Sequence, residues 1–455
     1  MTALVGYLML FVIMFLLMRN KMMPIVIFVT IPIVAILILK VPALPSVIAS
    51  EGLTFWGAVT AMFAEIGEMV NDGLGSVWKT AVLFIFSTSY FGIMNDAGMF
   101  DPVVDSLIRK AGSNVVFVTV ATAIIAILGH LDGATATTVL VTVPAMIPLY
   151  RRMKISPYSL LLIVGCAMGV MNLVPWGGPI VRVATVLNMD VTELWHYLLP
   201  FQGVALVATI VIAAVCGIIE KKNGAGQFTD EELKEMEEAK LDEEAAALKR
   251  PNLFIFNIAL TLILIVCLCL SIMPTHVCFM IAFGIGIAVN YPGLKEQQAR
   301  FKAHASEALN MSATLLAAAV FIGVMQNSGM LDAMVDVLLA IIPESLGRFM
   351  NIIAGIISVP VGAVLGADTF YYGVFPLLGE AAAKFGVPQL DVGVAMLIGK
   401  NVGMIISPLQ PTTYLACGLA GVEVAAHIKK NFLVTWLISI LLCVIAILMG
   451  TMSIY

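Results

Sequence analysis

Long apolar runs separated by short polar stretches cover most of the chain. About ten of these runs are close to the roughly 20 residues that an α-helix needs to cross a bilayer. The pattern therefore predicts an all-α, polytopic membrane protein with five spans in each half. The predicted spans lie near residues 2–18, 23–40, 77–97, 157–190, 198–219, 253–273, 275–291, 308–328, 391–420 and 430–453.

Two further apolar stretches, 113–152 and 348–385, are too long for one crossing and are polar in the middle. Each has an apolar arm, a polar tip that contains glycine (129–138 and 366–373) and a second apolar arm. We interpret both as re-entrant hairpins. Irregular backbone at membrane depth is tolerated only against protein or a water-filled cavity, so each tip predicts a cavity.

Two of the predicted spans, 157–190 and 391–420, contain paired prolines. Proline lacks an N–H group and clashes with the preceding helical turn, so both helices should unwind at their centres. Unwinding exposes carbonyl groups to a cation and the N–H groups of the next half-helix to an anion. A plain proline kink is the alternative, but two breaks at matching places, each after a hairpin, favour a binding site. The prolines are Pro175, Pro179, Pro408 and Pro411.

One short pattern occurs twice at a constant separation, since 323 − 92 and 336 − 105 both give 231, about half of the 455 residues. Because five spans per half is an odd number, the second copy must enter the membrane upside down, and the repeats are predicted to be inverted. This arrangement is typical of transporters whose substrate site lies between the repeats. The identical pairs are Gly92 and Gly323, Met94 and Met325, Gly98 and Gly329, Met99 and Met330, Asp101 and Asp332, and Asp105 and Asp336.

The chain then divides into a first repeat (1–220), a polar cytoplasmic linker (221–250) and a second repeat (251–455). Within the linker, Thr229 and Glu232 fit a capping box that starts a surface helix through Leu248. We expect a solvated connector; a docking site for a regulator is the alternative.

Composition agrees with a membrane protein, because apolar residues are 61% of the chain, charged residues are 12% and mean hydropathy is +1.03. The pI near 5.6 implies no nucleic-acid partner. Placing the N-terminus outside puts most basic loop residues inside, as the positive-inside rule requires, with Arg348 and Lys384 as exceptions. We therefore expect an integral protein of the inner (cytoplasmic) membrane, surrounded by lipid, with both termini extracytoplasmic.

Asp132 and Asp368 occupy the two predicted hairpin tips. A free carboxylate substrate would be repelled by both acids unless each were protonated or bound to a cation, and carboxylate oxygens suit Mg²⁺ or Ca²⁺. The same acids are candidate proton carriers, since an intramembrane carboxylate is costly when charged. Capping of the second hairpin arms is the structural alternative.

His130 is a further candidate for proton coupling, because an unperturbed histidine titrates near about pH 6.5. Arg182 and Lys400 flank the helix breaks, and either could hold a carboxylate; a salt bridge or a snorkelling position is the alternative. The other candidate substrate ligands are Thr135, Thr137, Thr138, Asn172, Gly177, Gly178, Thr369, Asn401, Ser407, Gln410, Thr412 and Thr413.

The first tip, which reads Gly-His-Leu-Asp-Gly-Ala-Thr-Ala-Thr-Thr over 129–138, resembles the citrate-metal:proton symporter family, CitMHS, whose members have a His-Leu-Asp-Gly tip. Thr135 to Thr138 followed by Pro144 also resembles the hairpin of the divalent anion:sodium symporters of the wider ion transporter superfamily. In those symporters a Ser-Asn-Thr triplet opens the tip, whereas here the triplets are Gly-Ala-Thr at 133–135 and Ala-Asp-Thr at 367–369.

The resemblance implies an elevator-type carrier, a homodimer, that moves citrate or a related carboxylate as a divalent-metal complex with protons. It implies no tightly bound cofactor, with Mg²⁺ or Ca²⁺ entering as part of the substrate. Sodium-coupled di- or tricarboxylate transport, gluconate or C4-dicarboxylate transport and cation/proton antiport are the alternatives. No Gly-x-Ser-x-Gly, His-Glu-x-x-His or Walker A motif occurs, so we do not expect an enzyme.

Overall fold

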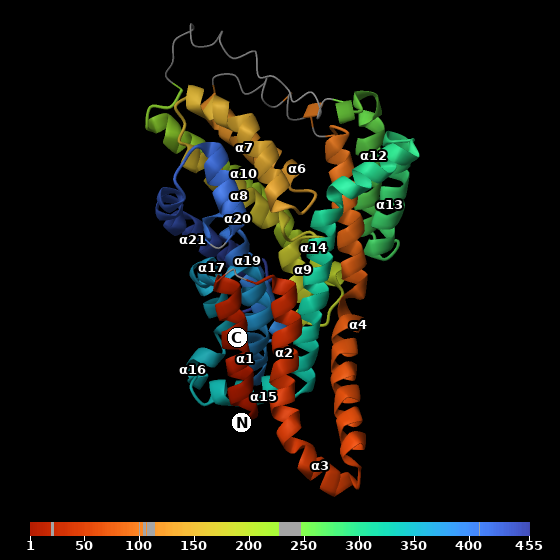
Figure 1. Ribbon diagram of the computed structural model, residues 1–455. Helices are drawn as coiled ribbons and strands as arrows, with labels where there is room; N and C mark the ends of the chain where they lie inside the picture. The colour runs from red at the N-terminus through yellow and green to blue at the C-terminus, as the bar shows by residue number, and fades with distance from the viewer. Residues whose placement is uncertain (20–21, 100, 103–105, 107–113, 227–246, 409) are drawn as a thin grey trace.

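The computed structural model describes residues 1–19, 22–99, 101–102, 106, 114–226, 247–408 and 410–455, and every regular element in these ranges is a helix (Figure 1). The first half contains α1 (Thr2–Arg19), α2 (Pro24–Lys40), η1 (Val41–Ala43), α3 (Leu44–Glu51), α4 (Phe55–Asp96), α6 (Val115–Gly129), α7 (Thr135–Arg152), α8 (Pro157–Met171), α9 (Gly178–Val186) and α10 (Val191–Lys222). The second half contains η3 (Pro251–Leu253), α12 (Phe254–Cys269), α13 (Thr275–Asn290), α14 (Leu294–Asn327), α15 (Met330–Leu339), α16 (Glu344–Gly347), α17 (Met350–Asp368), η4 (Thr369–Val374), α18 (Phe375–Lys384), α19 (Gln389–Asn401), η5 (Met404–Ile406), α20 (Pro411–Ala420) and α21 (Val424–Leu448).

By length and composition, seven helical segments among the described residues can cross a membrane. Several apolar helices are shorter, α8 and α13 among them, because breaks and turns divide them. The seven segments are Pro24–Glu51, Phe55–Asp96, Val191–Lys222, Pro251–Cys269, Ala308–Asn327, Met350–Lys384 and Val424–Leu448.

The prediction of a span at 77–97 was wrong about where the helix begins, because α4 starts at Phe55, and Thr54 caps it by accepting a hydrogen bond from the Gly57 N–H. The additional turns are polar on one side but bury Met62, Ile66 and Met69 at spacings of three and four residues. Continuous apolar runs do not reveal an amphipathic helix of this kind, because its apolar residues recur only every three or four positions. Helix α14 likewise begins at Leu294, before the predicted 308.

The helices form two bundles (Figure 1). We call α1, α2, α4, α12, α13, α14 and α15 the scaffold bundle; its central contact is the long antiparallel pair α4 and α14. The hairpin bundle consists of α6 to α10 and α17 to α21, including η4 and η5. The two bundles meet along a boundary that includes α15 against α18 and α1 against η4.

Each half contributes one helical hairpin to the hairpin bundle. Helices α6 and α7 form the first hairpin, and the chain between them turns at Gly133, whose φ is +72°. The second hairpin consists of α17, η4 and α18, and its backbone departs from helical geometry at Gly366 (φ 73°, ψ 172°). The predicted tip 366–373 was therefore too long, because Thr369–Val374 is already a π-helical part of the second arm.

Two helices are interrupted near the hairpin turns. Helix α8 ends at Met171 and α9 begins at Gly178, and we call the segment between them the first break. Helix α19 ends at Asn401 and α20 begins at Pro411, with η5 in the second break between them.

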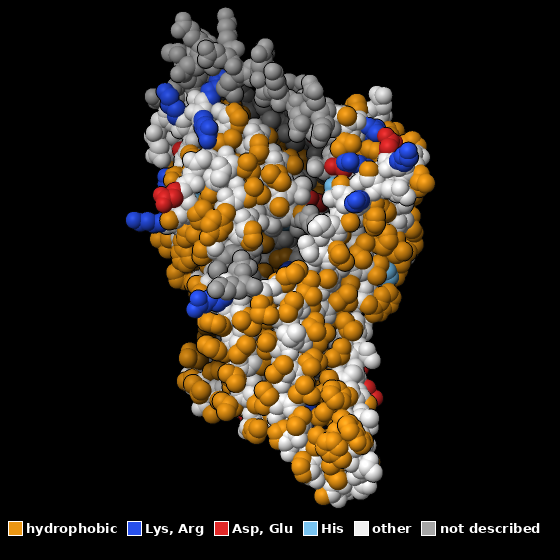
Figure 2. Space-filling view, viewed as in Figure 1, with side chains coloured by type: hydrophobic (Ala, Val, Ile, Leu, Met, Phe, Trp, Pro, Cys, Tyr) orange, Lys and Arg blue, Asp and Glu red, His pale blue; other side chains and the backbone are white. Residues whose placement is uncertain are grey.

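Apolar side chains cover the surface of α1 and α2, whereas Lys and Arg side chains gather at the end of the molecule from which the linker leaves (Figure 2). Leu4, Leu8 and Phe11 of α1 and Val34 and Ile38 of α2 are exposed, as expected for a surface against lipid. The predicted capping box in the linker, and Asp105 of the repeated pattern, lie outside the described residues.

Candidate functional site

A cavity of about 380 Å³ lies where the two hairpin turns and the two breaks come together. The first hairpin contributes Gly133 to Thr135, and the second contributes Leu365 to Thr369. Asn172 borders it from the first break, Gly178 from the start of α9 and Gln410 from the second break. Met22 and Met311 of the scaffold bundle form an apolar part of the wall, so the cavity lies at the boundary between the bundles.

An ion pair closes one side of this cavity. The Nε group of Arg182 in α9 donates to Oδ1 of Asp368 at 2.8 Å, and its Nη2 atom forms an ion pair with the same oxygen at 2.7 Å. The guanidinium also lies 5.9 Å from the ring centroid of Tyr372. The two charged side chains remain 21% and 20% exposed, because both face the cavity. The salt bridge that we considered as an alternative for Arg182 is thus present, and it lies inside the candidate site.

The corresponding contact of the first hairpin carries no charge. The hydroxyl groups of Thr135, at the start of α7, and Thr412, at the start of α20, are 3.0 Å apart. Each hairpin therefore reaches the half-helix that follows the break of the other half of the chain. One of these contacts is an ion pair and the other is a neutral hydrogen bond.

His130 links the first hairpin to the first break. Its ring is fully buried, with Nδ1 2.6 Å from the Thr138 hydroxyl and Nε2 3.2 Å from Oδ1 of Asn172. Nearby, Oδ1 of Asp132 accepts a hydrogen bond of 2.8 Å from the Ala134 N–H. Helix α7 has Ala134 as its N-cap, so Asp132 stabilises the turn and does not cap the helix.

The second hairpin makes a similar link through Tyr371, whose hydroxyl donates to Oδ1 of Asn401 at 3.0 Å. Lys400 is buried, with Nζ 5.8 Å and 5.4 Å from the ring centroids of Phe370 and Tyr371. The Thr369 hydroxyl and the Asn401 Nδ2 group are two of several buried side-chain groups without a hydrogen-bond partner among the described residues. Buried polar groups are normally paired, so a ligand in the cavity is a natural partner for the Thr369 hydroxyl, which lines it.

Ser407 and Thr413 hold the second break in shape. The Ser407 hydroxyl donates to the Ala363 carbonyl at 2.7 Å, and the Thr413 hydroxyl donates to the Ser407 carbonyl at 2.8 Å. At the first break, a Cβ on Gly177 would lie 2.5 Å from the Asn172 carbonyl oxygen, so only glycine fits there.

Seven of the residues selected from the sequence line the cavity: Thr135, Asn172, Gly178, Arg182, Asp368, Thr369 and Gln410. The others lie outside its lining: His130, Asp132, Thr137, Thr138, Gly177, Lys400, Asn401, Ser407, Thr412 and Thr413. Tyr371 and Tyr372 were not selected as candidate site residues, although they belong to the second polar tip. Their aromatic rings within a polar intramembrane stretch were the sequence signal that could have identified them.

A family model described as "Citrate transporter", CitMHS, matches residues 8–399. The chain belongs to this citrate transporter family. The resemblance stated from the first tip is therefore confirmed, and the protein is an integral, multi-pass membrane protein of a transporter family and not an enzyme.

Curated relatives of this citrate transporter family member come from Bacillus subtilis (strain 168). One, named "Citrate transporter", is 34% identical over 455 residues and covers 100% of both chains. Another, named "Mg(2+)/citrate complex secondary transporter", is 38% identical over 398 residues, which are 86% of this chain and 90% of the relative. The "Uncharacterized transporter YraO" is 30% identical over the same shares.

The fold resembles that of the YdaH transporter of Alcanivorax borkumensis, whose crystal structure was described as having an unusual topology. The TM-score is 0.59 with 14% identity, over 94% of this chain and 99% of YdaH. At this identity the likeness concerns the fold alone.

Whether this member of the citrate transporter family can bind a metal ion depends on its own side chains. No group of three or more His, Cys, Asp or Glu residues that could hold a metal ion occurs within the described ranges. Asp368 faces the cavity and Asp132 does not, and the assignment of either carboxylate to a cation stays a prediction.

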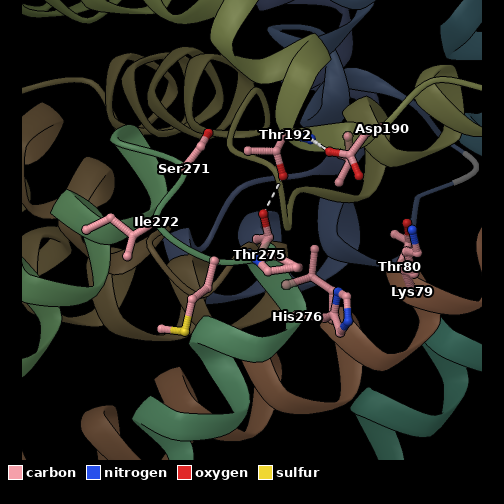
Figure 3. Close-up of a pocket in the computed structure, with 12 residues that line it drawn as sticks. Lys79, Thr80, Asp190, Thr192, Ser271, Ile272, Thr275 and His276 are labelled. Carbon is pink, nitrogen blue, oxygen red and sulfur yellow. Dashed lines mark hydrogen bonds between the residues drawn. The ribbon is translucent and has the colours of Figure 1, made fainter.

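A second cavity, of about 360 Å³, lies between α4, the start of α10 and the turn from α12 to α13 (Figure 3). The hydroxyls of Thr192 and Thr275 are hydrogen-bonded across it, and Asp190 accepts from the Thr192 N–H at 2.8 Å. Its charged side chains, Lys79 and Asp190, are exposed, and no hairpin turn or helix break borders it. We therefore take the first cavity as the candidate substrate site.

Proposed function

We propose that this protein is a secondary active transporter that imports citrate or a related carboxylate, as a complex with Mg²⁺ or Ca²⁺, by proton symport. The observation that carries the proposal is the cavity between the hairpin turns and breaks, which presents an arginine, an aspartate and an unpaired buried hydroxyl to a ligand. The relative named as a Mg(2+)/citrate complex transporter supports the same substrate class.

Contacts between α4 and α14 support the inverted repeats. A Cβ on Gly323 would lie 3.1 Å from Cα of Gly73, and a Cβ on Gly92 would lie 2.5 Å from the His304 ring. Adding the repeat separation of 231 converts Gly92 to Gly323 and Gly73 to His304. The two contacts are therefore the same contact with the halves exchanged, as a two-fold axis between inverted repeats requires.

The division into two bundles supports an elevator mechanism, in which the hairpin bundle carries the substrate past the scaffold bundle. The cavity lies at the boundary between them, where such movement would change its exposure. We further propose that the protein is a homodimer, as the family resemblance implies. We also propose that it lies in the cytoplasmic membrane with both termini outside, as the loop charges indicate.

His130 is well placed to carry a coupled proton. In the neutral ring, Nε2–H donates to Asn172 and Nδ1 accepts from the Thr138 hydroxyl. When the ring is protonated, the Thr138 hydroxyl can donate instead to the carbonyl of Gly129 at 3.2 Å or of Ala134 at 3.0 Å. The site can thus accept a proton with every hydrogen bond retained, while Asp132 and Asp368 remain further candidates.

Uptake of labelled citrate into proteoliposomes tests the proposal. We expect uptake to require both Mg²⁺ or Ca²⁺ and an inward proton gradient, and Asp132→Asn and Asp368→Asn to alter it. Equal uptake in EDTA would contradict transport of a metal complex. Uptake that follows a sodium gradient and ignores the proton gradient would contradict proton symport.

A further inference from the structure

The cavity holds two opposite charges that already neutralise each other. Of the residues that line it in the described part of the chain, Arg182 and Asp368 alone are charged. The Nε hydrogen bond and the Nη2 ion-pair contact of the guanidinium both go to the same oxygen, Oδ1 of Asp368. A ligand that enters the cavity must therefore either leave this pair intact or offer each member a new partner.

The pair also ties two separate elements together. Asp368 lies just after the turn of the second hairpin at Gly366, and Arg182 lies one turn into α9, after the first break. The guanidinium extends along the backbone of Gly178, where an added Cβ would lie 2.7 Å from Nη1. Opening the pair would remove this charged link between the second hairpin turn and α9.

Ligands of different charge would meet this pair differently. A free tricarboxylate could pair with Arg182, but it would place its negative charge against the released Asp368. A free divalent cation could bind Asp368, but it would leave the guanidinium beside a positive ion. Removing one partner of a buried charge pair is strongly unfavourable, because the other charge remains unpaired.

We propose that the Arg182–Asp368 ion pair selects a metal–carboxylate complex by exchanging partners with it. A carboxylate of the complex takes Arg182 from Asp368, and the divalent cation takes Asp368 from Arg182. Only a ligand that carries both charges replaces both halves of the pair. This inference rests on the proposed function and adds the device that discriminates the complex from its separate components.

Asp368→Asn is the decisive variant. Asparagine leaves Arg182 available to a carboxylate and removes the negative charge that repels free citrate. In proteoliposomes, we expect the ratio of citrate uptake with Mg²⁺ to uptake with EDTA to fall by about thirtyfold or more from the wild-type value, the scale associated with losing one member of a desolvated charge pair. Arg182→Gln should lower uptake in both conditions.

Asp101→Asn is the matched control, because it breaks an ion pair of similar length, 2.7 Å to Lys249, away from the cavity. Its uptake ratio should equal that of the wild type. The double variant Arg182→Gln/Asp368→Asn should be less impaired than Arg182→Gln alone, since no unpaired charge remains in the cavity.

A binding measurement on the purified wild-type protein tests the partner exchange without any variant. Its result therefore does not depend on whether a variant folds. A ligand that binds the native state raises the unfolding temperature, so Mg²⁺ with citrate should raise it, whereas Mg²⁺ alone and citrate in EDTA should not. Stabilisation by citrate in EDTA, or an Asp368→Asn ratio equal to that of the wild type, would overturn the partner exchange. Absence of citrate uptake by the wild type under all conditions would instead overturn the proposed function.

Discussion

His130 carries a prediction at the scale of the single residue. Its two ring nitrogens are both engaged, and Thr138 has alternative acceptors for its hydroxyl when the ring gains a proton. Replacing His130 by Gln should preserve one polar contact with Asn172 but remove the titrating group.

For His130→Gln we expect citrate uptake driven by a pH gradient to fall by at least about tenfold, equivalent to about 1.4 kcal/mol. Exchange of citrate across proteoliposomes without a gradient should be retained, because exchange needs no net proton movement. Equal loss of both activities would assign His130 a structural role only.

Gly366 provides a second test at this scale. Its φ of 73° with ψ of 172° belongs to a region that only glycine populates readily, and an added Cβ would meet no atom within 4 Å. Gly366→Ala should therefore act through backbone strain alone, at a cost of about 1 to 3 kcal/mol.

Thermal unfolding and citrate uptake of Gly366→Ala should both decline. Gly418→Ala in α20 is the control, since its surroundings are equally open and its φ is not positive. A Gly366→Ala protein as stable and active as this control would show that the second hairpin turn tolerates another conformation.

At the scale of elements, α4 and α14 approach each other closely at Gly73. A Cβ on Gly73 would lie 2.1 Å from the Ala319 carbonyl oxygen, so the two backbones are nearly in contact. Gly73→Ala should force the helices apart and cost about 1 to 3 kcal/mol, the usual effect of overpacking.

The control is Gly67→Ala on the same helix, where no atom lies within 4 Å of the added Cβ. It should leave stability unchanged or raise it slightly, because alanine has the higher helix propensity. A thermal unfolding temperature that is lower for Gly67→Ala than for Gly73→Ala would contradict the packing described for this pair.

The sequence predicted the helical class and the places where helices are interrupted, because prolines and apolar runs act locally. Pro175 and Pro179 predicted an interruption, and α8 does end at Met171. The early start of α4 at Phe55 was missed, because polar residues interrupt the apolar run in its first turns. The helix is stabilised there by packing against helices that are distant in the chain. Pairing of Arg182 with Asp368 could not be derived either, because 186 residues separate the two in the chain.

At the scale of the whole molecule, the elevator mechanism predicts that the two bundles must move past each other. Leu10 of α1 lies beside Gly373 of η4 at their boundary, since a Cβ on Gly373 would be 3.6 Å from a Leu10 methyl group. A cross-link between cysteines at these positions should hold the bundles together and abolish citrate uptake.

The experiment compares Leu10→Cys/Gly373→Cys, treated with a short bifunctional thiol reagent, with each single variant treated in the same way. Uptake should return when a reducible cross-link is cleaved, and the single variants control for the seven native cysteines. Full uptake by a completely cross-linked protein would contradict relative movement at this boundary.

The two hairpin turns are held by different chemistry, one by the Thr135–Thr412 hydrogen bond and the other by the Arg182–Asp368 ion pair. Substitution of one threonine loses a neutral bond, whereas substitution of one charged partner leaves an uncompensated charge. Evolution can therefore alter the first contact one residue at a time, but the second only through paired changes. Among homologues that carry different cargoes, positions 182 and 368 are expected to co-vary, while positions 135 and 412 drift independently.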